Sequence, residues 1–193
     1  MITIYVDLDS TLYDYKKSYL RYHFQKTGEI ITQSAVDNNG YALHKACGLD
    51  EDSKYEYLRH ENFFKDMLPY DGAINTIDSL YKLGKYEIIF VTHIVVPEAY
   101  MGKVESLQKF FNWFDFEQHL VTMKNKHLLV KGVIIDDNPF VIKNSNGHHI
   151  TIAFNQPWNT DIDSDFRING WDGELEEILK HIEYAKLDGR WLD

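Results

Sequence analysis

Four short runs of apolar residues, rich in isoleucine and valine, restrict what this chain can fold into. They span residues 2–6, 87–91, 132–135 and 149–154. Within them apolar residues follow one another instead of alternating with polar ones, which is typical of strands covered on both faces. Segments with helical spacing lie between the runs, so strands and helices alternate along the chain. This alternation predicts an α/β fold, a Rossmann-like parallel sheet with helices on both faces.

Three segments carry apolar residues at helical spacing, within residues 73–81, 104–111 and 175–182. Asp71 is placed to cap the first of these helices, and Gly84 is placed to end it. These helices supply the connections that parallel strands require, because such strands cannot be joined by a tight hairpin.

The stretch from about residue 15 to 70 interrupts this alternation. It lacks the apolar run of a buried strand and is rich in tyrosine, histidine, lysine and glutamate. We therefore expect a small, mostly helical insertion after the first strand. The predicted organisation is a core of residues 1–14 and 71–193 and a helical cap of residues 15–70, which suits a chain of 193 residues.

Composition excludes several classes of function. The 30 acidic and 20 basic side chains give a net charge of −10, which disfavours a nucleic-acid polymer as partner. The single cysteine, Cys47, excludes an intrachain disulfide and a cysteine-rich zinc site, and the histidine spacings match no zinc motif. There is no basic, apolar leader, and no apolar run approaches the ~20 residues that span a bilayer. We expect a soluble, cytoplasmic protein without a membrane partner, either a monomer or a homodimer.

Polar side chains follow the first three predicted strands where each strand ends. They are Asp7 and Asp9, then Thr92 and His93, then Asp136 and Asp137. Ligands of open α/β sheets bind at the carboxyl ends of the strands. Two residues that are two positions apart at a strand end point to the same side, so the side chains of Asp7 and Asp9 should converge. Carboxylates held close together repel each other, and a site that keeps them recruits a divalent cation or shares a proton.

Each of these features alone has an ordinary explanation. An acidic pair is often a solvated turn, a threonine at a strand end is common, and Lys124 and Lys126, upstream of the third strand, could be surface residues. Their order along the chain is acid pair, hydroxyl, lysine and acid pair, each near the correct end of a strand. Together they predict a functional site at this edge of the sheet.

The same residues resemble the four motifs of the haloacid dehalogenase (HAD) superfamily. The motifs are Asp7-Leu8-Asp9-Ser10-Thr11, Thr92, Lys126 and Asp136-Asp137. Within that superfamily the chain looks most like the 5′(3′)-deoxyribonucleotidases. The stretches that carry this similarity are residues 62–64, 68–73, 89–92, 154–159 and 169–171. The chain departs from the family at His93, where serine is common, and at Ala42, where animal members have a second aromatic residue.

The resemblance implies a Mg²⁺-dependent phosphatase that releases phosphate from (deoxy)ribonucleoside monophosphates through an aspartyl-phosphate. Asp7 would be the nucleophile and Asp9 the general acid and base. Thr92 and Lys126, with Lys124 as the alternative lysine, would hold the phosphoryl oxygens, and Thr11 would fix the loop beside Asp9. Mg²⁺ would bind Asp7, the backbone carbonyl of Asp9 and Asp137, with Asp136 further away or bound through water.

The cap would then exclude water and select the leaving group. Substrate-binding candidates in and near it are Tyr15, Tyr41, Leu43, Phe63 and His93. A base could stack on the aromatic rings, although such rings in a small helical cap commonly fill its own core.

Two other functions remain open at this point. One is a HAD phosphatase for another small phosphate ester, and the other is a non-catalytic phosphate-binding protein on the same scaffold. The sequence leaves open the base preference, ribose or deoxyribose, and the 5′ or 3′ position of the phosphate.

Overall fold

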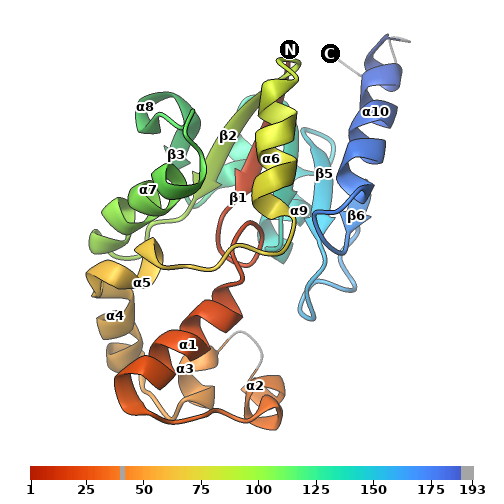
Figure 1. Ribbon diagram of the computed structural model, residues 1–193. Helices are drawn as coiled ribbons and strands as arrows, with labels where there is room; N and C mark the ends of the chain where they lie inside the picture. The colour runs from red at the N-terminus through yellow and green to blue at the C-terminus, as the bar shows by residue number, and fades with distance from the viewer. Residues whose placement is uncertain (40–41, 188–193) are drawn as a thin grey trace.

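The computed structural model describes residues 1–39 and 42–187 and contains one six-stranded sheet in that part of the chain (Figure 1). Neighbouring strands are parallel, and their order is β3-β2-β1-β4-β5-β6. The strands are β1 (Ile2–Asp7), β2 (Tyr86–Thr92), β3 (Leu120–Thr122), β4 (Val133–Asp136), β5 (Ile150–Phe154) and β6 (Phe166–Ile168). The predicted α/β class with a parallel sheet is confirmed.

The four strands predicted from apolar runs are β1, β2, β4 and β5. Six of their eight ends differ from the prediction by one residue, and the other two agree with it. Strands β3 and β6 were not predicted. Each has only three residues and lies at an edge of the sheet, where most of its side chains are partly exposed or exposed. Edge strands of this length show no continuous apolar run, so sequence periodicity does not reveal them.

Alternate residues of the central strands face opposite sides of the sheet, as a strand requires. On one side, Tyr5, Ile89, Val91 and Ile134 pack with Val141, which lies on α9 (Pro139–Ser145). The other side carries the larger core and is covered by α6 (Ala73–Lys82), α7 (Glu98–Phe110) and α10 (Glu174–Leu187).

The start of α6 differs from the prediction. Gly72, not Asp71, occupies the N-cap position, and no side chain caps this helix. Gly72 has a φ of 79°, and a Cβ atom built there would lie 2.2 Å from an oxygen of Asp172. The positive φ favours glycine at this position, and the local sequence pattern does not show which residue adopts it.

Five helices lie between β1 and α6, and Figure 1 shows them gathered at the end of the sheet where β1 leads into α1. They are α1 (Tyr15–Thr27), α2 (Gln33–Asn39), α3 (Leu43–Ala46), α4 (Glu51–Arg59) and α5 (Glu61–Lys65). Their bounds fall within the predicted insertion of residues 15–70, and this segment has no strand in its described part. Asp14 begins α1 by accepting a hydrogen bond from the backbone N–H of Lys17 at 2.8 Å.

Two short elements complete the fold: α8 (Phe116–His119) and a single 3₁₀ turn, η1 (Lys126–Leu128). Across the described part of the chain, no helix is both long and apolar enough to cross a membrane.

The register of the parallel strands brings three strand ends to one level. Asp7 is paired with Val91, which precedes Thr92. On the other side of β1, Val6 is paired with Ile135, so that Asp7 and Asp136 are the next residues of their strands. Side chains that are far apart in the sequence therefore meet at the carboxyl edge of the sheet.

Candidate active site

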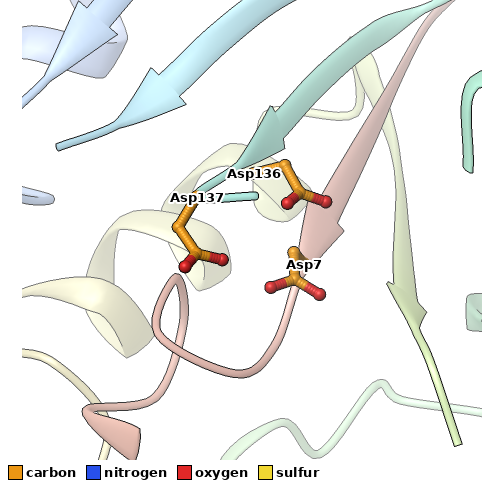
Figure 2. Close-up of side chains that lie close together, drawn as sticks. All are labelled: Asp7, Asp136 and Asp137. Carbon is orange, nitrogen blue, oxygen red and sulfur yellow. The ribbon is translucent and has the colours of Figure 1, made fainter. Parts of the chain in front are cut away.

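Three aspartates form a buried acidic cluster at this edge. Asp7 ends β1, Asp136 ends β4 and Asp137 follows directly. Each offers one carboxylate oxygen, and these oxygens lie within 4.8 Å of one another. Figure 2 shows the three carboxylates grouped in the space between the ends of the two strands.

Lys126 in η1 pairs with two of these carboxylates. Its ammonium group donates to Oδ1 of Asp7 and, at 2.7 Å, to Oδ2 of Asp136. Lys126 is only 5% exposed, so this ion pair is shielded from water. Lys126 thus contacts the acidic cluster directly, whereas Lys124 is exposed and lines the neighbouring cavity. Asp136, predicted as a remote metal ligand, uses one oxygen for Lys126 and the other for the backbone N–H of Asn138 at 2.8 Å.

Burial and mutual repulsion make the cluster hard to ionise fully. Burial raises the pKa of Asp7 to about 7, and the carboxylates of Asp136 and Asp9 add to the rise against the opposing effect of Lys126. Burial likewise raises the pKa of Asp137 well above its ordinary range, with further contributions from Asp7 and Asp136. Burial acts to lower the pKa of Lys126, but Asp136 and Asp7 outweigh it, and the pKa is raised.

The cluster suits a metal ion. Three carboxylates face a single ammonium group, so the fully ionised cluster has an excess of two negative charges. All the donor atoms are oxygens, which magnesium and calcium prefer, and no thiol or imidazole belongs to the cluster. A divalent cation would balance the charge that keeps the pKa values of Asp7 and Asp137 high.

Asp9 lies on the loop that follows β1, and distant contacts hold this loop. Ser10 has a φ of 65°, in the left-handed region that non-glycine residues seldom adopt. Its carbonyl accepts a hydrogen bond from Gln156 at 2.8 Å, and the carbonyl of Thr11 accepts one from the indole of Trp171 at 3.0 Å. The conformation next to Asp9 therefore depends on the C-terminal third of the chain.

Asp137 has its own set of supports. The indole of Trp158 donates to Oδ2 of Asp137 at 2.9 Å, and the amide of Asn159 donates to its backbone carbonyl at 2.8 Å. The hydroxyl of Thr11 lies 3.4 Å from Oδ1 of Asp137. Thr11 therefore contacts the acidic cluster itself.

The structure adds a second buried lysine that sequence reasoning missed. Lys103 in α7 is 1% exposed, and its ammonium group donates to Oδ2 of Asp9 at 2.6 Å and to Oγ1 of Thr92 at 2.7 Å. Lys103 is eleven residues from Thr92 and lies in a helix whose apolar pattern shows only that it packs on the sheet. Nothing in the local sequence distinguishes Lys103 from the exposed Lys109 of the same helix.

A cavity of about 390 Å³ lies between the acidic cluster and the inserted helices. Most of the predicted site residues line it; these are Asp7, Asp9, Tyr15, Leu43, Thr92, His93, Lys126, Asp136 and Asp137. Burial lowers the pKa of His93, and nearby lysines add to this effect. Tyr41 lies outside the described residues.

Phe63, predicted to contact substrate, does not line this cavity. It is 3% exposed and packs edge-on against Tyr15, Tyr19 and Tyr22 inside the cap. The next residue, Phe64, lines the cavity instead, because successive residues of α5 face different directions.

Two residues of α4, Tyr55 and Leu58, also line the cavity, and sequence reasoning did not single them out. They lie three residues apart on one side of that helix. Helical spacing alone does not show whether that side faces the cap interior or a ligand.

Comparison with known proteins places this chain in a family. A profile of the family described as 5′ nucleotidase, deoxy (Pyrimidine), cytosolic type C protein matches residues 1–185. A Staphylococcus aureus (strain Mu50) protein named "Putative 5′(3′)-deoxyribonucleotidase" is 29% identical over 129 residues, which cover 66% of this chain and 69% of that protein. The 5′(3′)-deoxyribonucleotidase of Clostridium acetobutylicum is 23% identical over 151 residues, which cover 77% and 79% of the two chains.

A solved structure shares the fold. The "putative HAD-hydrolase YfnB" of Bacillus subtilis, whose crystal structure is described as bound to magnesium, matches with a TM-score of 0.58 and 18% identity. The match covers 94% of this chain and 97% of that protein. At this identity the likeness describes the arrangement of the chain, namely the HAD fold.

Proposed function

The chain is a HAD-type phosphatase that belongs to the 5′ nucleotidase, deoxy (Pyrimidine), cytosolic type C family, and we propose that it hydrolyses deoxyribonucleoside monophosphates to nucleoside and phosphate. The observation that carries this proposal is the position of Asp7. Its carboxylate lies at the end of a central strand, contacts Lys126, and lines a cavity together with Asp9, Asp136 and Asp137. This arrangement provides a nucleophile, a cationic group and an acid within one cavity.

In the proposed reaction, Asp7 attacks phosphorus and forms an aspartyl-phosphate. The attack brings a carboxylate toward a phosphate dianion. At 4 Å and an effective dielectric constant of about 20, each pair of unit charges costs about 4 kcal/mol, so the dianion costs roughly twice that. Lys126 offsets part of this repulsion, because its ammonium group already contacts Asp7 and can reach the phosphoryl oxygens.

Mg²⁺ is the cofactor of the proposal. Asp7, Asp137 and the backbone carbonyl of Asp9 would hold it, and Asp136 would contribute through Lys126 or through water. When bound, the ion supplies positive charge at the phosphoryl oxygens. The all-oxygen donor set supports this choice, and so does the magnesium-bound structure of the HAD-hydrolase from Bacillus subtilis.

Asp9 is the proposed general acid and base. It protonates the departing sugar oxygen and then accepts a proton from the water that hydrolyses the aspartyl-phosphate. Thr92 is the proposed hydrogen-bond donor to a phosphoryl oxygen. Its hydroxyl oxygen accepts a hydrogen bond from Lys103, so the hydroxyl proton is free to point at a phosphoryl oxygen.

The nucleoside would occupy the part of the cavity that the cap encloses. Tyr15, Leu43, Tyr55 and Leu58 supply apolar and aromatic surface there. A cavity of about 390 Å³ is within the usual size range for small-molecule sites, which is about 300–1,000 Å³. Phe63 stabilises this wall from behind, and its direct contact with substrate is not part of the proposal.

The test is Mg²⁺-dependent release of phosphate from a panel of esters. The panel holds the common 5′ and 3′ nucleoside monophosphates in ribose and deoxyribose forms, several sugar phosphates and p-nitrophenyl phosphate. We expect the highest kcat/KM with a deoxyribonucleotide and loss of activity in EDTA. Preference for a sugar phosphate would assign the chain to another small ester. No hydrolysis of any ester would contradict the proposal, and the binding protein would then be the remaining interpretation. The cytoplasmic location and the oligomeric state stay predictions from sequence.

A further inference from the structure

Lys103 contacts the proposed acid without lining the cavity itself. We infer that Lys103 is a positioning residue that holds the carboxyl group of Asp9 and the hydroxyl of Thr92 in place for phosphoryl transfer. The inference rests on the proposed function, since it assigns a role to Asp9 in that reaction. It is supported by hydrogen bonds, burial and the donor chemistry of an ammonium group.

The two oxygens of Asp9 have different surroundings. Oδ2 accepts a hydrogen bond from the ammonium group of Lys103 at 2.6 Å. Oδ1 is buried and has no hydrogen-bond partner within the described residues. An ammonium group has only donors, so Oδ2 must act as an acceptor whenever this contact is made. Lys103 therefore anchors the carboxyl group of Asp9 through Oδ2.

The position of Lys103 is itself fixed by several groups. Its ammonium group donates to Thr92 at 2.7 Å and lies 4.8 Å from the ring centroid of Phe64, in α5 of the cap. At 1% exposure the side chain has no access to bulk water, and a buried ammonium group is stable only with such partners. These contacts hold the carboxyl group of Asp9 in one orientation, next to the hydroxyl of Thr92.

The proposed steps balance with this assignment. An oxygen of Asp7 bonds to phosphorus while the bond from phosphorus to the sugar oxygen breaks. The electron pair of that bond stays on the sugar oxygen, which takes the proton of the Asp9 carboxyl group. In the second step water bonds to phosphorus and gives a proton to the carboxylate of Asp9, and the bond from phosphorus to Asp7 breaks. Asp7 leaves as a carboxylate, so both carboxyl groups return to their starting forms.

This role predicts a dependence on the leaving group. A sugar oxygen needs a proton to depart, whereas the phenolate of p-nitrophenyl phosphate departs without one. For a two-step hydrolysis, kcat/KM reports the steps up to the departure of the leaving group. A residue that positions the acid should therefore affect kcat/KM far more for a nucleotide than for p-nitrophenyl phosphate, and a residue that only supports the fold should affect both alike.

The experiment compares K103M, K103R and D9N with wild type on the preferred nucleotide and on p-nitrophenyl phosphate. K109M, an exposed lysine of the same helix, is the matched control. We expect K103M to lower kcat/KM for the nucleotide by about 30-fold or more, within the range of general acid catalysis, and by less than about fivefold for p-nitrophenyl phosphate. D9N should show the same selectivity, K103M/D9N should lose little more than D9N, and K103R should recover part of the loss. Thermal unfolding checks that each variant is folded; if K103M is not, K103R and K103Q provide the comparison.

Two results would overturn the inference. Equal losses on both esters would show that Lys103 supports the fold without positioning the acid. Wild-type activity on the nucleotide in K103M would show that Asp9 needs no such partner. In both cases the wild-type enzyme would still be an active phosphatase, so the proposed function would survive. A wild-type chain that hydrolyses neither ester would overturn the proposed function and this inference with it.

Discussion

The cavity has two walls that are built by different physical means. The acid wall consists of Asp7, Asp9, Lys126, Asp136 and Asp137, and the cap wall consists of Tyr15, Leu43, Tyr55, Leu58 and Phe64. The acid wall is charged, and its side chains are held by strand register and by ion pairs to buried lysines. The side chains of the cap wall are aromatic and aliphatic, and they pack against other rings of the cap. Lys16 and Lys54 of the cap also line the cavity.

This difference separates reaction chemistry from the choice of substrate. The acid wall carries groups that can act on any phosphate ester, because they meet only the phosphoryl group and the departing oxygen. The cap wall meets the part of the substrate that differs from one ester to another. Changes at Asp7, Lys126 or Asp137 should therefore reduce turnover of every ester, and changes in the cap wall should alter KM for large esters only.

The largest effect is expected at the nucleophile. Asp7→Asn should lower turnover more than about a thousandfold with every ester, because a neutral amide does not attack phosphorus at a useful rate. Phosphate release measures this, and circular dichroism checks that the variant is folded. Activity near the wild-type level would exclude Asp7 as the nucleophile.

Removal of metal should come next. EDTA should lower turnover at least about a hundredfold, and Mg²⁺ should restore it. Mg²⁺ should also raise the melting temperature, since a ligand that binds only the folded state stabilises it. Asp137→Asn should reduce this rise, and Lys109→Met serves as the control. An unchanged melting temperature in Mg²⁺ for the wild-type protein would argue against a metal site in the acidic cluster.

A change in the cap interior should affect stability and leave substrate affinity unaltered. Phe63→Leu retains apolar volume, whereas Phe63→Ala removes a buried ring and should lower the free energy of unfolding by about 3–5 kcal/mol. Urea unfolding measures this loss. At a temperature where both variants are folded, KM for the nucleotide should stay within about twofold of wild type, by analogy with other substitutions away from a binding site. A large rise in KM with little loss of stability would place Phe63 in the cap wall after all.

The acidic cluster should also make stability depend on pH in the metal-free protein. The pKa of Asp7 is raised from 3.8 to about 7 on folding, so between these values the folded state holds a proton that the unfolded state has lost. The free energy of unfolding should fall as pH rises through this window, by up to about 1.4 kcal/mol per pH unit for one proton. Asp7→Asn should flatten the slope, as denaturant unfolding at several pH values can measure. A stability that rises across the same window would contradict the raised pKa.

The smallest effect is expected in the cap wall. Tyr15→Leu should raise KM for the preferred nucleotide about fivefold, since stacking of a base on an aromatic ring contributes about 1–3 kcal/mol. KM for p-nitrophenyl phosphate should change less than about twofold on the same estimate. Steady-state kinetics on both esters makes the comparison, and Tyr184→Leu, an exposed residue of α10, is the control. Equal changes for both esters would show that Tyr15 affects the acid wall and does not contact the nucleotide base.

Strand ends show how far sequence reasoning reached. Asp7, Thr92 and Asp136 could be predicted to meet because each follows or ends an apolar run, and parallel strands place such residues at one edge. The short edge strands β3 and β6 could not be predicted, because strands of three residues with mostly exposed or partly exposed side chains carry no periodic signal. Gly72, with a φ of 79°, stands at the start of α6, whereas the local pattern favours Asp71, whose side chain could cap a helix.

The sequence by itself determined the α/β fold and the chemical types that gather at the edge of its sheet. Local patterns report these features because burial of apolar runs and the alternation of strand and helix leave few arrangements of the chain. Only the tertiary structure decided which lysine meets which aspartate, and which of two adjacent phenylalanines lines the cavity. Lys103 and Asp9 are 94 positions apart in the sequence. They come within hydrogen-bond distance only because α7 packs against the sheet.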